Sequence, residues 1–313
     1  MAQTFFPLSA VEISPATASA WIDVDVSAYV PSGATGVILH CVNTSATAYA
    51  FGLRKNGSTD ARIQNLHTTT HCWAAIGVDA SRIFEAYVGD TTYIDIYLVG
   101  YTMSGVTFFT NAYDKSLTAT AAWTDINCAT EAPSATGLVF EIAGGSAAYA
   151  MGLRKNGSTN NRIASAYYHC DFGVIIGCDA SQICEGYIGN VAVDFFLVGY
   201  ITDGCTFNTN ATDVSLATTA TWLDLTALPA TANMGFIEVA TATTYTYGLR
   251  KNGSAEDIYW DALRHPWAFV ECDASQIIEG EIANVAVDFF VVGYATAAAP
   301  PVAKPRSFGY IIG

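Results

Sequence analysis

Short stretches in which apolar and polar residues alternate recur along the whole chain, and no stretch keeps the period of a helix over several turns. Residues 21–26 read Trp-Ile-Asp-Val-Asp-Val, the alternation expected of a half-buried strand. Residues 36–42 form a nearly continuous apolar run between turn residues, which indicates a second strand. Further strands are predicted at residues 49–55, 72–78, 83–88 and 92–101, together with a Thr-Phe-Phe segment that opens the chain. The pattern predicts an all-β protein.

The same pattern occurs three times. The string Gly-Leu-Arg-Lys-Asn-Gly-Ser recurs at residues 52–58, 152–158 and 248–254. An Asp-Ala-Ser triplet and a closing Gly-Tyr pair follow each copy at similar spacing. Seven or eight short strands in about 100 residues are typical of a β-sandwich or jelly roll. We therefore predict three tandem jelly-roll-like β-sandwich repeats, at residues 1–105, 106–204 and 205–298, followed by an extended C-terminal tail at 299–313.

Two local predictions follow from turn chemistry and composition. The Asn-Gly pairs at residues 56–57, 156–157 and 252–253 favour two-residue type I′ hairpins, in which both residues have positive φ. Residues 255–264 of the third repeat are predicted to form one short helix.

The tail begins with a proline-rich linker that contains Pro300, Pro301 and Pro305, and we expect it to be extended. The apolar segment after it leaves two interpretations open: it folds back on its own third repeat, or it docks on a neighbouring subunit. As the contact residues of such an arm we expect Lys304, Arg306, Phe308, Tyr310, Ile311 and Ile312.

Composition narrows the classes of function. Hydrophobic residues make up 51% of the chain and charged residues 13%, which excludes an intrinsically disordered protein. The apolar stretches are shorter than the ~20 residues of a membrane-spanning helix, so no membrane partner is expected. A net charge of −15 argues against nucleic-acid binding. The first residues have neither a basic nor an apolar region, so we expect no secretory signal peptide.

Repeated charged residues are the first candidates for chemistry. An Arg-Lys pair precedes each Asn-Gly turn, and each repeat also carries two strand acids; the three sets are Arg54, Lys55, Arg154, Lys155, Arg250 and Lys251, then Glu85, Glu185 and Glu279, then Asp95, Asp194 and Asp288. Ion pairs within each repeat are the interpretation we favour. A repeated contact with a neighbouring subunit and a site for a carboxylate ligand stay open. The Asp-Ala-Ser triplets are interpreted as turns, with calcium binding as the alternative.

The remaining candidate groups indicate no catalysis. Cysteines that replace core aliphatic residues, such as Cys178 and Cys272, are expected to be buried thiols. Disulfides stay open for Cys41, Cys72, Cys128 and Cys170. The chain contains no motif of a serine hydrolase, a zinc protease or a phosphate-binding loop. We expect no enzymatic activity, no cofactor and no metal.

One resemblance bears on function. The Gly-Leu-Arg-Lys-Asn-Gly-Ser string followed by Arg62 or Arg162, the Gly-x-Asp-Ala-Ser-x-Ile segment and the closing Val-Gly-Tyr together resemble repeats in structural proteins of tailed bacteriophages. That resemblance implies a capsid decoration, collar or tail-associated role, with copies of itself and other virion proteins as partners, in particles assembled in the host cytoplasm. The third repeat departs from it at residues 255–257. The alternative is a surface adhesin or carbohydrate-binding module, in which Trp73, Trp260, Trp267 or tyrosines in loops would stack on sugars.

Overall fold

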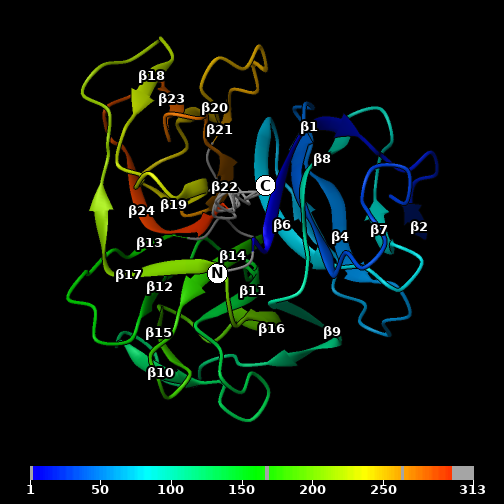
Figure 1. Cartoon of the computed structure of the whole chain (residues 1–313), viewed down its shortest axis with the longest axis horizontal. Coiled ribbons are helices and arrows are strands. Elements are labelled where there is room, and N and C mark those ends of the chain that lie inside the picture. Colours follow the sequence, from blue (N-terminus) through cyan, green and yellow to red (C-terminus); the bar gives the residue numbers. More distant parts are fainter. Residues whose placement is uncertain (1–2, 166–168, 262–263, 298–313) are drawn as a thin grey trace, which may run out of the picture.

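The computed structural model describes residues 3–165, 169–261 and 264–297, and these residues form strands and loops without any helix (Figure 1). They divide into three units of eight strands. The strands of unit 1 are β1 (Phe5–Glu12), β2 (Trp21–Asp25), β3 (Gly36–Asn43), β4 (Tyr49–Lys55), β5 (Gln64–Leu66), β6 (Thr70–Gly77), β7 (Ile83–Val88) and β8 (Ile94–Thr102). Those of unit 2 are β9 (Val106–Asp114), β10 (Thr124–Asn127), β11 (Gly137–Ala143), β12 (Ala150–Lys155), β13 (Ala164–Ser165), β14 (Asp171–Gly177), β15 (Ile183–Ile188) and β16 (Asp194–Ile201). Those of unit 3 are β17 (Cys205–Asp213), β18 (Leu223–Leu225), β19 (Ala232–Thr241), β20 (Thr246–Lys251), β21 (Trp260–Asp261), β22 (Trp267–Glu271), β23 (Ile278–Ile282) and β24 (Val287–Thr296).

Strand pairing within a unit is nested. In unit 1, β1 pairs with β8, β2 with β7, β3 with β6 and β4 with β5, so the chain forms one long hairpin. Antiparallel pairing of β8 with β3, and of β7 with β4, rolls that hairpin into two four-stranded sheets in the orders β1-β8-β3-β6 and β2-β7-β4-β5. Units 2 and 3 repeat both orders. Each unit is therefore a jelly roll, and the predicted all-β fold of tandem β-sandwich repeats is confirmed.

Burial explains why the predicted patterns became these strands. Residues of β7 alternate strictly between buried and partly exposed, as expected for a strand with one face on a core. All eight residues of β3 are buried, because one face packs inside unit 1 and the other faces a neighbouring unit.

The three units form a closed ring. Unit 1 meets unit 2 where Asn65 bridges Cys170 in parallel, with the Asn65 N–H donating to the His169 carbonyl at 2.7 Å. Unit 3 meets unit 1 in the same way: Asp261 of β21 bridges Thr70 of β6, and the Asp261 N–H donates to the Thr69 carbonyl at 2.8 Å. This last bridge joins two four-stranded sheets, from units 1 and 3, into one of eight strands. Strands β6, β14 and β22 lie around the centre of the ring (Figure 1).

Two sequence predictions are wrong in detail. Gly57 has a positive φ of 79°, but Asn56 does not, which is the pattern of a type II rather than a type I′ turn. Instead of doubling back at once, the chain runs through a loop at residues 56–63 before β5, and the Asn56 side chain donates to Asp79 at 2.7 Å. No helix forms at residues 255–261, because Trp260 and Asp261 are held in β21 by pairing with β20.

All eight cysteines are free thiols, so the alternative of disulfides within the chain is wrong; seven are buried and Cys205 is partly buried. Burial raises the pKa of the Cys178 thiol to about 12. The thiol therefore stays protonated at neutral pH and is unreactive, as expected of a core residue. The tail residues Lys304, Arg306, Phe308, Tyr310, Ile311 and Ile312 lie outside the described residues.

Replacing Gly57 by Val should lower the free energy of unfolding by about 1 kcal/mol or more. A side chain at this position would have no atom within 4 Å, so the cost arises from the positive φ alone. Gly157 and Gly253 have φ of 79° and 76°, and the same substitution there should cost the same amount. Urea unfolding of the three variants measures this; unchanged midpoints would show that the turn tolerates a β-branched residue.

Candidate functional site

The repeated Arg-Lys pairs lie at the ends of β4, β12 and β20, next to the contacts between units. We call these contacts seams: the first seam joins units 1 and 2, the second joins units 2 and 3, and the third joins units 3 and 1. The seams hold most of the buried charge of the described chain, and we take them as the candidate functional site.

The arginine of each pair stays within its own unit. The Arg54 guanidinium donates to both carboxylate oxygens of Glu85 at 2.9 and 2.8 Å, and it stacks 4.1 Å above the ring of Trp21. Arg154 with Glu185 and Arg250 with Glu279 repeat this arrangement. The predicted ion pairs within each repeat are confirmed for these residues, and they link β4 to β7, β12 to β15 and β20 to β23.

The second set of strand acids is not ion-paired, so that part of the prediction is wrong. Asp95, Asp194 and Asp288 make no salt bridge within the described residues. Burial raises the pKa of Asp95, and the nearby charge of Glu12 raises it further. Each of these acids has an acidic neighbour on the first strand of its unit. An ion pair would have required a lysine or arginine at that place.

The Asp-Ala-Ser triplets form the predicted turns. The Asp79 carboxylate accepts hydrogen bonds from the backbone N–H groups of Ser81 and Ile83 at 2.8 and 2.9 Å. The same two contacts are made by Asp179 and Asp273. These carboxylates are occupied by the turn itself.

The lysine of each pair reaches across a seam in two of the three cases. Lys55 donates to the Phe108 carbonyl of unit 2, and Lys155 donates to the Phe207 carbonyl of unit 3, each at 3.1 Å. Lys251 instead forms an ion pair with Glu271 of its own unit at 2.6 Å. The first two seams are thus alike, and the third differs.

A phenylalanine side chain fills the space beside each crossing lysine. The ring of Phe108 covers Gly36 and Gly77 of unit 1 so closely that a Cβ at Gly36 would lie 2.3 Å from the ring. Phe207 covers Gly137 and Gly177 of unit 2 in the same way. At the third seam Pro7 stands at the position of the phenylalanine, paired with Gly100 as Phe108 is with Gly199, and Met234 and Glu271 replace the glycines.

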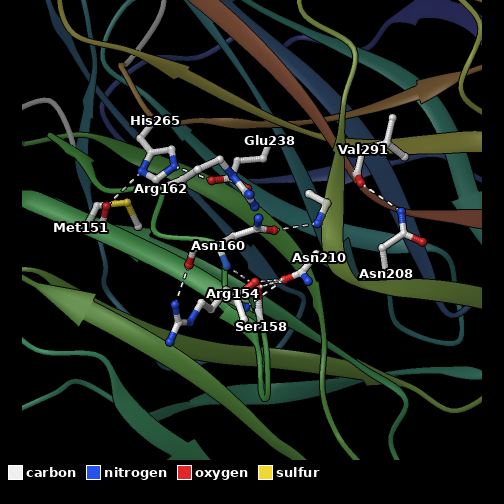
Figure 2. A network of polar contacts seen from close by, with 12 residues as sticks. Met151, Arg154, Ser158, Asn160, Arg162, Asn208, Asn210, Glu238, His265 and Val291 are labelled. Atoms are coloured by element: carbon white, nitrogen blue, oxygen red, sulfur yellow. Dashed lines mark hydrogen bonds and ion pairs between the residues drawn. The ribbon is translucent and has the colours of Figure 1, made fainter.

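The loop after each hairpin binds an asparagine of the next unit at the first two seams. The Ser58 hydroxyl and the Thr59 N–H donate to the Asn111 side-chain oxygen, both at 2.9 Å. Ser158 and Thr159 bind Asn210 in the same way, as Figure 2 shows for Ser158. The third seam has no such asparagine. Between its paired positions at Pro7 and Val11, β1 has only Leu8, Ser9 and Ala10, one residue fewer than β9 has between Phe108 and Tyr113.

A buried ion pair crosses the first seam. Arg62 donates to both oxygens of the Glu141 carboxylate, each at 2.7 Å, and the two side chains are 15% and 10% exposed. Asp171 lies nearby, and burial raises its pKa well above the usual range, with the Glu141 charge raising it further. Burial raises the pKa of Glu141 as well, and the hydrogen bonds and charge of Arg62 oppose that rise.

The second seam has the same pair with a histidine added. Arg162 binds Glu238 with its Nε at 2.8 Å, and His265 lies between Glu238 and the Met151 carbonyl, at 2.8 and 3.0 Å (Figure 2). Burial alone would raise the pKa of Glu238, but hydrogen bonds and charges from His265 and Arg162 outweigh it and lower that pKa. Glu238 is ionised although its side chain is fully buried.

The third seam has lost both members of the pair. Ile258 follows Arg250 at the spacing of Arg62 after Arg54, and its carbonyl lies against Gly248 as that of Arg62 lies against Gly52. At the position of Glu141 stands His40, which shares a hydrogen bond of 2.9 Å with His71 and stacks on Trp73. Burial lowers the pKa of His71 to about 3 and that of His40 well below its usual range. A neutral pair thus replaces the ionic one.

A cavity of about 270 Å³ lies at the third seam. Leu8, Ser9, His40 and Trp73 line it from unit 1, and Lys251, Ser254 and Glu271 are among its residues from unit 3. A more open depression of about 410 Å³ lies at the second seam, beside Arg162 and Phe290. The cavity at the third seam lies where β1 has no residue equivalent to Phe108 or Asn111.

The hairpins could be predicted from the sequence, but the residues that bind them across the seams could not. One sequence signal pointed to these contacts: Arg62 and Arg162 recur at the same place in the first two repeats, and the third repeat has no equivalent arginine. The acids that pair with them lie on strands that read as apolar runs. Of the tryptophans considered for sugar binding, Trp73 and Trp267 are buried at 2% and 0% exposure, and Trp260 is partly buried in β21.

Within the described residues, no group of three or more His, Cys, Asp or Glu side chains is arranged to hold a metal ion. The same part of the chain has no helix long and apolar enough to cross a membrane.

Comparisons with known proteins add little. No protein-family model and no curated protein matches the chain. Among solved structures, a chain of the Sulfolobus Turreted Icosahedral Virus aligns at 9% identity and a TM-score of 0.24, covering 94% of this chain and 92% of that chain. The N-terminal CBM22-1-CBM22-2 tandem domain of Xyn10C from Paenibacillus barcinonensis aligns at 8% identity and a TM-score of 0.15, covering 57% and 81%. At these TM-scores neither match supports an argument about this chain.

Replacing Arg62 by Ile should lower the free energy of unfolding by about 3 kcal/mol, because Glu141 is left buried without its cation. Adding Glu141→His gives this seam the two residues that stand at these positions in the third seam, Ile258 and His40, and should recover most of that loss. The double-mutant cycle in urea unfolding measures the coupling, which we expect to be about 2 kcal/mol. Additive losses from the two substitutions would contradict charge compensation at the seams.

Acid should weaken the third seam. His40 and His71 are neutral in the folded protein, whereas histidines of the unfolded chain titrate near a pKa of about 6.5. Below that pH the unfolded state binds protons that the folded state does not, so stability falls as the pH drops from about 6.5 towards 3. For His71 alone the loss at pH 5 should be about 2 kcal/mol. Melting temperatures of the protein and of His71→Asn between pH 7.5 and 5 test this, and equal slopes would contradict it.

Proposed function

We propose that this chain is a non-enzymatic structural protein of a virus particle, such as a phage capsid decoration, collar or tail-associated protein, and that it acts through contacts with other proteins. The observation that carries the proposal is the closed ring of three jelly rolls. Buried ion pairs and phenylalanine side chains hold unit 1 against unit 2 and unit 2 against unit 3, and the bridge between β21 and β6 joins unit 3 to unit 1. Such a ring is a rigid block with three similar faces.

A block of this kind suits a repeating assembly. Equivalent loops of the three units recur around the ring, so one chain presents three similar contact points, as a homotrimer would. Weak contacts that engage together bind far more tightly than any one of them alone. Val191 and Val285, at equivalent turns of units 2 and 3, are 57% and 56% exposed, which gives two such points an apolar side chain.

The charge distribution fits a protein partner. Arg54, Arg62, Arg154, Arg162 and Arg250 are all engaged in ion pairs with acids of the chain. Their charge is therefore not available to bind phosphate groups. A body with a net charge of −15 would repel a nucleic-acid backbone.

The alternative function, a surface adhesin or carbohydrate-binding module, has less support. Aromatic side chains that stack on sugars must be exposed, and Trp73 and Trp267 are buried in the seams and core. Exposed Tyr29, Tyr93 and Tyr113 remain as groups that could contact a glycan.

Purified particles from the source of this sequence should contain the chain together with a major capsid protein, as measured by mass spectrometry. The recombinant protein should also co-sediment with particles that lack it. A protein that ends after Ala299 should melt like the full chain but co-sediment less, because Lys304, Arg306 and the apolar residues of the arm are predicted to dock on a neighbour. Absence from the particles, or binding to glycans instead, would overturn the proposal; equal co-sedimentation of the two proteins would exclude only the arm.

A further inference from the structure

The serine that follows each Asn-Gly pair has a different environment at the third seam than at the other two. Ser58 and Ser158 are each 6% exposed, because an asparagine of the next unit covers them. Ser254, at the same position of the third hairpin, is only half-buried. Its oxygen accepts from the Glu256 N–H at 3.1 Å, as the oxygen of Ser58 accepts from the Asp60 N–H. Within the described residues its hydroxyl proton has no acceptor, and neither does the N–H of Ala255.

The groups that bind an asparagine at two seams are therefore present but unused at the third. In the filled seams, the hydroxyl of the serine and the N–H of the following residue converge on one side-chain oxygen. Ser254 and Ala255 supply the same two donors. The cavity of about 270 Å³ that Ser254 lines is large enough for an amino-acid side chain or two.

We propose that the third hairpin is a docking site for a partner protein, and that the partner binds through an extended segment carrying an asparagine, with an aromatic residue close before it. The class of ligand follows from the two occupants that the fold itself contains, which are Phe-x-x-Asn-Ala in both β9 and β17. Asn enters the cavity and accepts from Ser254 and Ala255, and the aromatic ring packs against Leu8 at its wall.

Other occupants fit less well. The β9 and β17 segments of a second copy are already bound in its own seams, so a second copy would have to open first. The chain's own tail contains no asparagine, aspartate or glutamine in residues 298–313. Of the charged side chains that line the cavity, Lys251 is paired with Glu271 and Arg250 with Glu279, whereas Glu256 has no ion pair among the described residues. In this part of the described chain no free cation is left for an anionic group, which favours a carboxamide over a carboxylate.

This inference rests on the proposed function, since it names the chemistry of one partner contact, but it can be tested separately. The probe is a synthetic peptide with the sequence of residues 107–113, Thr-Phe-Phe-Thr-Asn-Ala-Tyr. Isothermal titration calorimetry with the full chain should show one binding site. A peptide with leucine in place of asparagine should bind at least tenfold more weakly, because it has no acceptor for the two donors.

Two matched variants of the chain locate the site. Ser254→Ala should weaken peptide binding about fivefold and leave the melting temperature nearly unchanged. Ser158→Ala, the same change at a filled seam, should lower the melting temperature and leave peptide binding unchanged. The reverse result, with binding lost in Ser158→Ala, would mean that the peptide displaces β17, and it would overturn the proposal.

A graft closes the site from within the chain. Replacing Leu8, Ser9 and Ala10 by the Phe-Thr-Asn-Ala of residues 109–112 should raise the melting temperature and abolish peptide binding. If the grafted protein does not fold, the comparison of Ser254→Ala with Ser158→Ala still tests the proposal. Absence of peptide binding to the unmodified chain would overturn this inference and leave the particle experiment unaffected. Peptide binding without particle association would leave the site standing and overturn the virion role.

Discussion

A charge that leaves water must find an opposite charge, and this constraint links the three units. Arg62 and Arg162 carry a buried positive charge from one unit into the next, and each is met by a glutamate on a strand that is otherwise apolar. Where the arginine is replaced by Ile258, the facing residue is His40, which burial keeps neutral. Loss of one partner without the other would leave a buried charge unpaired, so the two changes are coupled across a seam between residues far apart in the chain. Two of the three interfaces that close the ring pair a buried arginine with a glutamate, and the third has uncharged residues at both positions.

Shape is matched across the seams in the same reciprocal way. Gly36 and Gly77 have no side chain because Phe108 occupies the space where their Cβ atoms would be. Unit 3 has Met234 and Glu271 at these positions, and the strand that faces them has Pro7 instead of a phenylalanine. The glycines in units 1 and 2 are therefore needed for contact between units and not for turns. The third seam has neither the glycines nor a ring at the position of Phe108, and a cavity remains there.

The sequence was sufficient to predict what depends on local pattern, and insufficient for what depends on pairs of distant residues. Alternation and turn residues located most strands of unit 1, and residues 49–55 and 83–88 matched β4 and β7 at both ends. The ion pair of Arg54 with Glu85 could be foreseen because both lie on strands of one repeat. Short β5 has no pattern of its own, and the helix predicted at residues 255–264 failed because pairing with β20 and β6 outweighs local preference. Glu141 and Glu238 sit inside apolar runs, and only the fold shows that Arg62 and Arg162 reach them.

The bridge between β21 and β6 ties the last unit made by the ribosome to the first. Unit 1 is complete once Thr102 has been synthesised, but its face toward unit 3 stays uncovered until residue 261 has left the ribosome. At ~5–20 residues per second this takes roughly ten to thirty seconds, during which the nascent chain exposes His40 and Trp73 to solvent. The other two seams close in the order in which the chain is made. The seam that waits longest is the one without a buried ion pair. Only the shorter waits, of Arg62 for Glu141 and of Arg162 for Glu238, leave half of a salt bridge unmatched.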